Sequence, residues 1–162
     1  MENNAKAKIT LFVIRLVLGF IFLWAFFDKL LGLGFATTPD KAWIVGGSPT
    51  YGFLKLATYG VFAQFYQAIA GTTFVNVTFM LALLLLGIAL LLGICMRTAG
   101  YGGALLMILM WSARLPPEQN PVFDEHIVYA LVLILLTLVN LDELSIKRLW
   151  RKKNKGNKKK KG

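Results

Sequence analysis

The sequence predicts an all-α polytopic membrane protein: a bundle of four membrane-spanning helices with an extracytoplasmic loop and an interfacial helix. Hydrophobic residues make up 57% of the 162 residues, and the mean hydropathy is +0.63. Soluble domains are usually only about 45–50% apolar. Four apolar runs are separated by polar or glycine- and proline-rich breaks, and ten of the eighteen Lys and Arg residues lie in residues 147–161. One domain with a basic tail accounts for this pattern.

Residues 1–8 are predicted to form a cytoplasmic N-terminal arm, and residues 9–31 the first span. A helix of that length is about 34 Å long, against a hydrocarbon core of roughly 30 Å. Arg15 lies inside this span, on one helical stripe with Gly19 and Lys29. Because lipid does not solvate a guanidinium group, we expect Arg15 to be an intramembrane charge that faces protein. Snorkelling of its side chain to the near headgroups is the alternative.

The segment after the first span divides into a loop and an apolar stretch. Residues 32–50 contain glycines and prolines typical of a loop. Residues 51–70 are apolar and aromatic but carry Lys55, Gln64 and Gln67. This composition favours a helix that lies in the membrane interface or folds back against the bundle over a full crossing.

Three further spans are predicted at residues 75–96, 99–115 and 126–141. The membrane domain then covers residues 9–145, with a tight connection at Arg97 and Thr98 between its second and third spans. Small residues such as Ala99 and Gly103 are spaced to let another helix approach closely. Residues 146–162 form a basic tail.

The distribution of cations predicts the orientation. With four spans, Lys6, Lys8, Arg97 and the tail lie on one side of the membrane. Only four cations lie on the other side, in loops or at span ends: Lys29, Lys41, Lys55 and Arg114. Since cytoplasmic loops are enriched in Lys and Arg, both termini are expected in the cytoplasm.

Residue counts exclude several kinds of site. Cys95 is the only cysteine, so an internal disulfide or a CxxC redox pair is impossible. His126 is the only histidine, and we therefore expect neither a metal site nor a haem. The net charge of +10 comes largely from the tail and predicts contact with the lipid bilayer, with no nucleic-acid partner.

The predicted topology gathers most of the polar residues of the membrane domain on the outer face. They are Asp28, Lys29, Lys41, Arg114, Glu118, Asp124, Glu125 and His126. Lys and Arg in a partly desolvated pocket can bind an oxyanion, while His126 and its neighbouring carboxylates can move protons. A network of ion pairs that locks the helix ends together is the alternative.

Some of these residues also carry a family resemblance, which covers about residues 10–142. The first span resembles the first helix of the DoxX family, through Arg15, Leu18, Gly19, Phe22, Asp28, Lys29 and Leu30. The last span begins like that family's last helix, through Asn120, Pro121, Asp124, His126 and Tyr129. The loop is similar to the DoxD branch, through Ala42, Trp43, the run from Gly46 to Thr50, and Gly52, Phe53 and Leu54.

The resemblance implies a prokaryotic four-helix membrane subunit of thiosulfate:quinone oxidoreductase. That enzyme couples two thiosulfates to tetrathionate with a quinone as electron acceptor, and it works with a second redox subunit. With the polar residues above, catalytic roles are expected for His126, Asp124 and Glu125. Thiosulfate would be bound by Arg114, Lys29, Asp28 and Lys41, and the quinone by Trp111 and Trp24. The alternative function is a non-catalytic membrane anchor or assembly subunit for a redox partner.

Overall fold

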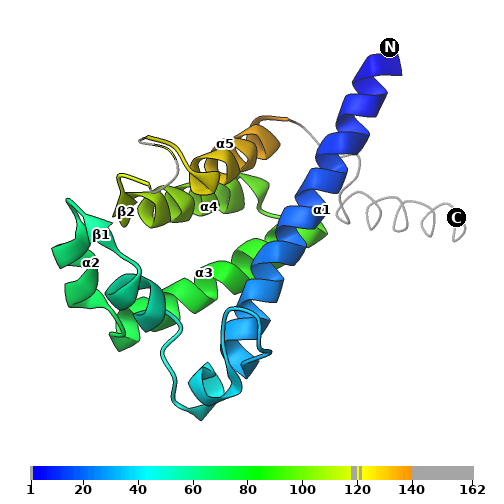
Figure 1. Cartoon of the computed structure of the whole chain (residues 1–162). Helices are drawn as coiled ribbons and strands as arrows, with labels where there is room; N and C mark the ends of the chain where they lie inside the picture. Colours follow the sequence, from blue (N-terminus) through cyan, green and yellow to red (C-terminus); the bar gives the residue numbers. More distant parts are fainter. Residues whose placement is uncertain (1, 118–119, 121, 140–162) are drawn as a thin grey trace, which may run out of the picture.

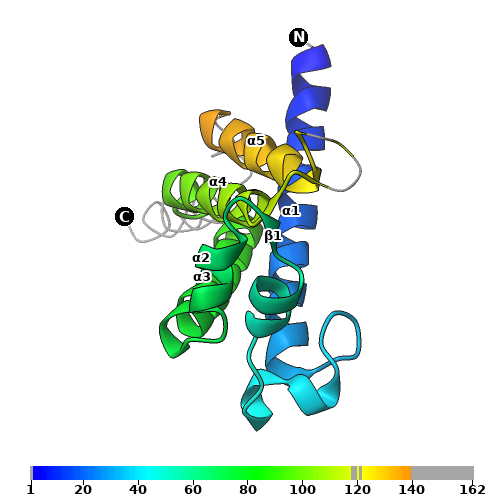
Figure 2. The same cartoon turned by 60° about the vertical axis from the view of Figure 1, so that its left-hand side comes forward.

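The structure, a computed structural model, describes residues 2–117, 120 and 122–139, with side chains from Lys6 onward. This part of the chain is mostly helical. Its four long helices are α1 (Glu2–Leu31), α3 (Thr73–Leu92), α4 (Met96–Ser112) and α5 (Glu125–Leu138). In both views α1 crosses α3 while α4 and α5 lie side by side (Figures 1 and 2). Among the described helices, α1 and α3 are long and apolar enough to cross a membrane.

The four long helices share one hydrophobic core. Its buried residues are Leu18 and Phe22 from α1, Leu83, Leu86 and Leu90 from α3, Ala104 and Met107 from α4, and Ala130, Leu133 and Leu136 from α5. Helices α1 and α3 approach each other closely at Gly87. A Cβ atom on Gly87 would lie only 2.9 Å from the backbone nitrogen of Leu23, so a larger residue would not fit there. Small residues allow helix backbones this close an approach.

The connection between α3 and α4 lies at residues 93–95, so the prediction of a turn at Arg97 and Thr98 is wrong. Gly93 has φ +67° and ends α3, and Cys95 also has a positive φ of 49°. Glycine is favoured at this position because a left-handed residue closes the last helical turn. A Cβ atom on Gly93 would lie 2.7 Å from a guanidinium nitrogen of Arg15. The glycine therefore both ends the helix and leaves room for Arg15.

Other helix bounds also differ from the prediction. Helix α1 includes residues 2–8, which were predicted as an arm, and ends at Leu31 as expected. Helix α4 ends at Ser112 rather than residue 115, because Arg114 and Leu115 form a short strand, β2 (Arg114–Leu115). Helix α5 is described as far as Leu138. The rest of the span predicted at 126–141, Glu118 and the tail 146–162 include residues outside the described part of the chain.

The prediction of one continuous helix over residues 51–70 is also wrong. The segment contains a π-helical turn η3 (Gly52–Leu56), a strand β1 (Tyr59–Gly60) and a helix α2 (Ala63–Ile69). Gly60 has φ +80°, which interrupts any continuous helix. Two 3₁₀ turns, η1 (Pro39–Lys41) and η2 (Trp43–Val45), shape the preceding loop.

Helix α4 offers a matched pair of glycines for a stability test. A Cβ atom on Gly100 would overlap the hydroxyl of Thr137 and lie 2.8 Å from the carbonyl oxygen of Leu133, whereas one on Gly102 would meet open space. Gly100→Ala is expected to lower the free energy of unfolding by about 1–3 kcal/mol, because α5 must move away. Gly102→Ala is expected to raise it by about 0.5–1 kcal/mol through helix propensity. Unfolding of both variants in detergent measures the difference, and equal effects would contradict the close α4–α5 contact.

Candidate functional site

A polar cavity of about 400 Å³ lies where β1, the end of α4 and the start of α5 meet. We call it the polar cavity. Its lining residues are Tyr59, Arg114, Pro117, Asn120, Phe123, Asp124 and Glu125. Three of the predicted site residues, Arg114, Asp124 and Glu125, are therefore brought together by the fold.

The strand pair places Arg114 beside Tyr59. Strands β1 and β2 are parallel, with Tyr59 opposite Arg114 and Gly60 opposite Leu115. The Tyr59 amide donates a hydrogen bond of 3.3 Å to the carbonyl of Ala113, and the Arg114 guanidinium carbon lies 5.7 Å from the Tyr59 ring centroid. Such a cation–π contact holds the guanidinium over the ring face. The pairing thus fixes the position of the cation in the cavity.

Tyr59 is a candidate site residue that the sequence analysis missed. Its hydroxyl oxygen is buried and has no hydrogen-bond partner among the described residues. An unsatisfied buried hydroxyl is costly, so it is a ready donor for a ligand in the cavity. Nothing in the sequence near Tyr59 indicates this role, because it depends on pairing with a strand 55 residues away.

Asp124 and His126 form a hydrogen-bonded pair at the start of α5. One carboxylate oxygen of Asp124 accepts from the backbone N–H of His126 at 3.0 Å and so caps the helix. The other lies 2.9 Å from Nδ1 of His126. A carboxylate oxygen accepts hydrogen bonds, so this contact suits a His126 ring that carries its hydrogen on Nδ1. His126 is buried and lies behind Asp124, outside the residues that line the cavity.

The segment that leads into α5 is shaped by Asn120 and is bonded to α4 through Trp111. The side-chain oxygen of Asn120 accepts from the amides of Val122 and Phe123 at 2.9 and 3.0 Å. The indole N–H of Trp111 donates to the carbonyl of Val122 at 2.8 Å. Trp111 therefore holds in place the segment that forms one wall of the polar cavity.

The same segment offers a possible cation site. Asp124, Glu125 and His126 each present a ligand atom, and these atoms lie within 4.8 Å of one another. Carboxylate and imidazole groups are common metal ligands. However, Arg114 already places a positive charge in the cavity that Asp124 and Glu125 line. The absence of a metal stays a prediction.

Asp28 lies apart from the polar cavity and has a structural role. It is 2% exposed, and its two carboxylate oxygens accept from the amides of Phe35 and Ala36 at 3.2 and 3.0 Å. These charge-assisted bonds fold the loop back onto the end of α1. The expected part of Asp28 in substrate binding has no support in this arrangement.

We expect Asp28→Asn to destabilise the protein by about 1–3 kcal/mol, because an amide cannot accept both loop hydrogen bonds as a carboxylate does. Asp40→Asn is the control, since Asp40 is fully exposed. Chemical unfolding of both variants in detergent measures the loss. Equal stability of the two variants would show that Asp28 does not hold the loop.

The two predicted lysine ligands also lie outside the polar cavity. Lys29 lines a different, apolar cavity, and Lys41 is exposed on the turn η1. Beside Lys41, a side-chain hydrogen bond from Thr38 lowers the pKa of the Asp40 carboxyl below its usual value. Asp40 therefore stays ionised, and its charge offsets that of Lys41.

Trp24 and Arg15 are likewise held by other parts of the protein. Trp24 stacks on Phe20 and meets Phe35 edge to face, with ring centroids 5.9 and 5.1 Å apart. Arg15 is 1% exposed and faces protein, with its guanidinium carbon 4.9 Å from the ring centroid of Phe12. It lies beside Gly93 at the carboxyl end of α3, where the helix dipole favours a cation.

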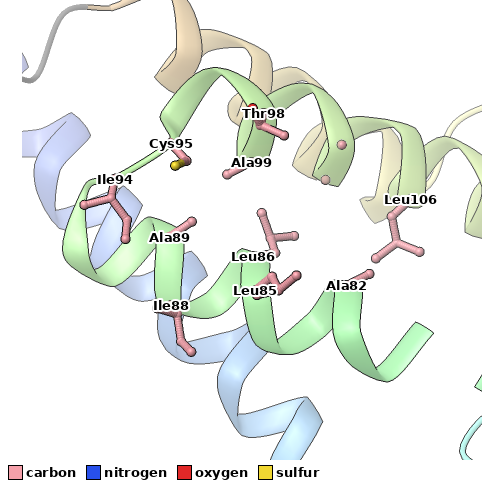
Figure 3. A pocket seen from close by; sticks show the side chains of 12 residues that line it. Ala82, Leu85, Leu86, Ile88, Ala89, Ile94, Cys95, Thr98, Ala99 and Leu106 are labelled. Atoms are coloured by element: carbon pink, nitrogen blue, oxygen red, sulfur yellow. The ribbon is translucent and has the colours of Figure 1, made fainter. Parts of the chain in front are cut away.

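An apolar groove of about 400 Å³ lies between α3 and α4 (Figure 3). Side chains from both helices and from the connection between them line it, among them Leu85, Ala89, Cys95 and Leu106. We call it the α3–α4 groove. It contains no titratable residue apart from Cys95 and so differs from the polar cavity in chemistry.

Comparison with protein-family models, with curated proteins and with solved structures gives no match for this chain. The resemblance to the DoxX family therefore stays a prediction.

Proposed function

We propose that the protein works in sulfur and quinone redox metabolism, oxidising thiosulfate to tetrathionate with a quinone as electron acceptor. The observation that carries this proposal is the polar cavity, in which Arg114 and Tyr59 lie with the acidic start of α5. A guanidinium fork and a phenolic hydroxyl are donors suited to a dianionic oxyanion. The DoxX resemblance supplies the choice of thiosulfate and quinone.

The cavity can serve both halves of this reaction. Two thiosulfate ions join through a new S–S bond, and the two electrons released, together with two protons, reduce one quinone to quinol. Arg114 and Tyr59 would hold the anion. Asp124 and His126 would carry protons, since their side chains form a hydrogen-bonded carboxylate–imidazole pair at the edge of the cavity. Both acids would repel thiosulfate, but the hydrogen bonds to Asp124 disperse part of its charge.

The proposal places the chain in a prokaryotic inner membrane with four spans and both termini cytoplasmic. Helices α1 and α3 have the necessary length and apolarity. Helices α4 and α5 have 17 and 14 described residues, or about 26 and 21 Å, which is short of the roughly 30 Å hydrocarbon core. Both expose large apolar side chains, including Leu105, Leu109, Leu131 and Leu138. Contact with lipid accounts for these better than contact with water.

The quinone ring would lie against Trp111, which borders the segment that walls the polar cavity. Trp24 is the second candidate, and its flat face is partly covered by Phe20. Aromatic rings of this kind stack on a planar headgroup.

A non-catalytic anchor or assembly subunit for a redox partner is the second candidate function. The α3–α4 groove favours it, because Ala99 and Gly102 in its lining are small, and a Cβ atom on Gly102 would meet open space, so another helix could approach closely there. A membrane helix of a partner subunit would fit this surface. The basic tail, which lies outside the described residues, would add an electrostatic contact.

Reconstitution of the purified chain in quinone-containing liposomes separates the two functions. Thiosulfate-dependent quinone reduction and tetrathionate formation by the chain alone would support catalysis. Activity only after a co-purified partner is added would support the anchoring role. No activity in either preparation would reject thiosulfate oxidation.

A further inference from the structure

The apolar cavity that contains Lys29 is distinct from the polar cavity and from the α3–α4 groove in most of its lining. It has a volume of about 310 Å³ and lies between η3, α2, α3 and α4, near the end of α1. We call it the Lys29 cavity. Its walls are mostly aliphatic and aromatic, including Phe53, Phe74, Phe79 and Leu109. Ligand cavities of about 300–1,000 Å³ with few polar groups are typical of small-molecule sites.

Lys29 is the one charged residue in the lining of this cavity. Its ammonium nitrogen lies 6.0 Å from the ring centroid of Phe79, and it has no hydrogen bond or ion pair among the described residues. The neighbouring carboxylate of Asp28 is engaged by loop amides. Lys29 is partly buried, and a partly desolvated ammonium is stabilised by a hydrogen-bond acceptor, so an anionic oxygen in the cavity would bind there favourably.

The lining has three other polar side chains, Thr50, Tyr66 and Thr78, and the first two are already paired. The hydroxyl of Tyr66 is 2.6 Å from that of Ser112, and the hydroxyl of Thr50 donates to Asn76 at 2.6 Å. They leave Lys29 as the main donor for a ligand. The ligand must therefore present one anionic head to Lys29 and an apolar body to the rest of the cavity.

We propose that the Lys29 cavity binds an amphiphile with an anionic oxygen head and a single apolar chain. A free long-chain carboxylate and an anionic lysophospholipid both have this chemistry. The inference goes beyond the proposed function and does not depend on thiosulfate or quinone.

Binding of three probes to the purified full chain in nonionic detergent tests the proposal. Laurate supplies a carboxylate head, dodecanol supplies the same chain with a neutral head, and lysophosphatidate supplies a phosphate head. Wild-type protein is expected to bind at least one anionic probe about tenfold or more tightly than dodecanol, as one charge-assisted contact provides. Which anion binds more tightly distinguishes the two sources. Equal binding of all three probes, or binding of none, would overturn the proposal.

Two variants locate the site. Lys29→Gln is expected to bind laurate and dodecanol equally, because the ammonium is lost. Thr78→Trp fills the Lys29 cavity from α3 and is expected to weaken all three probes about tenfold or more. Leu85→Trp is the matched control, since Leu85 lies two turns further along α3 and lines only the α3–α4 groove. Wild-type affinity in Thr78→Trp, or an equal loss in Leu85→Trp, would contradict the assignment. If Lys29→Gln does not fold, the comparison of anionic and neutral probes on the wild-type protein still tests the proposal.

Discussion

Replacing Gly60 by alanine is expected to separate the two strands that build the polar cavity. Gly60 has φ +80°, and a Cβ atom there would overlap the carbonyl oxygen of Leu115 in the paired strand. The substitution adds left-handed strain of about 1–2 kcal/mol and an overpacking cost of about 1–3 kcal/mol. Because the carbonyl belongs to the backbone, no side-chain rotation relieves the overlap. The Tyr59–Ala113 hydrogen bond is expected to break, and Arg114 to lose its place over Tyr59.

Gly34→Ala is the matched control for this effect. Gly34 has φ +86° and nothing within 4 Å of a built Cβ atom, so it has the strain without the overlap. Chemical unfolding in detergent is expected to show a clearly larger loss of stability for Gly60→Ala than for Gly34→Ala. Equal losses would mean that β1 and β2 do not pair as described.

Replacing Arg114 by alanine is expected to lower thiosulfate-dependent quinone reduction by about 100-fold to 1,000-fold. Removal of one preorganised donor from an anion site has effects of this size. Arg114→Lys keeps the charge but loses the planar fork, so we expect only partial activity. Tyr59→Phe removes the buried hydroxyl while it keeps the ring under the guanidinium, and its loss is expected to be smaller.

The control for Arg114 is Arg97, an exposed cation near the opposite end of α4. Arg97→Ala is expected to keep wild-type rates in the same liposome assay. Steady-state rates at saturating quinone, measured across a range of thiosulfate concentrations, separate weaker binding from slower chemistry. An Arg114→Ala protein as active as the wild type would remove the polar cavity from the reaction.

Much of the helical framework could be predicted from the sequence. Long apolar runs predict α1, α3, α4 and α5, because a helix surrounded by other apolar helices or by lipid needs apolar residues along its length. The end of α1 at Leu31 was predicted correctly, because a glycine follows it in the sequence. In the structure Gly32 has φ +67°, the left-handed conformation that ends a helix. Asp124 before α5 is likewise a recognisable helix cap. Local chemistry determines each of these features.

The arrangement of the site could not be predicted, because it depends on contacts between distant segments. A two-residue parallel strand pair joins Tyr59 to Arg114, and no local pattern indicates it. Asp28 and Lys29 are adjacent in sequence, but Asp28 binds loop amides whereas Lys29 lines a separate, apolar cavity. The prediction that all charged residues of the outer face share one site ignored that adjacent side chains on a helix point about 100° apart.

Chemical labelling of one cysteine at the polar cavity tests the central claim most directly. Phe123 lines the cavity and is 59% exposed, and Phe123→Cys in a Cys95→Ser background gives a single reactive thiol. We expect a membrane-impermeant maleimide to label it in intact cells but not in inverted vesicles, and thiosulfate to slow the labelling. Labelling from the cytoplasmic side alone, or a rate that thiosulfate does not change, would contradict an outward-facing anion site.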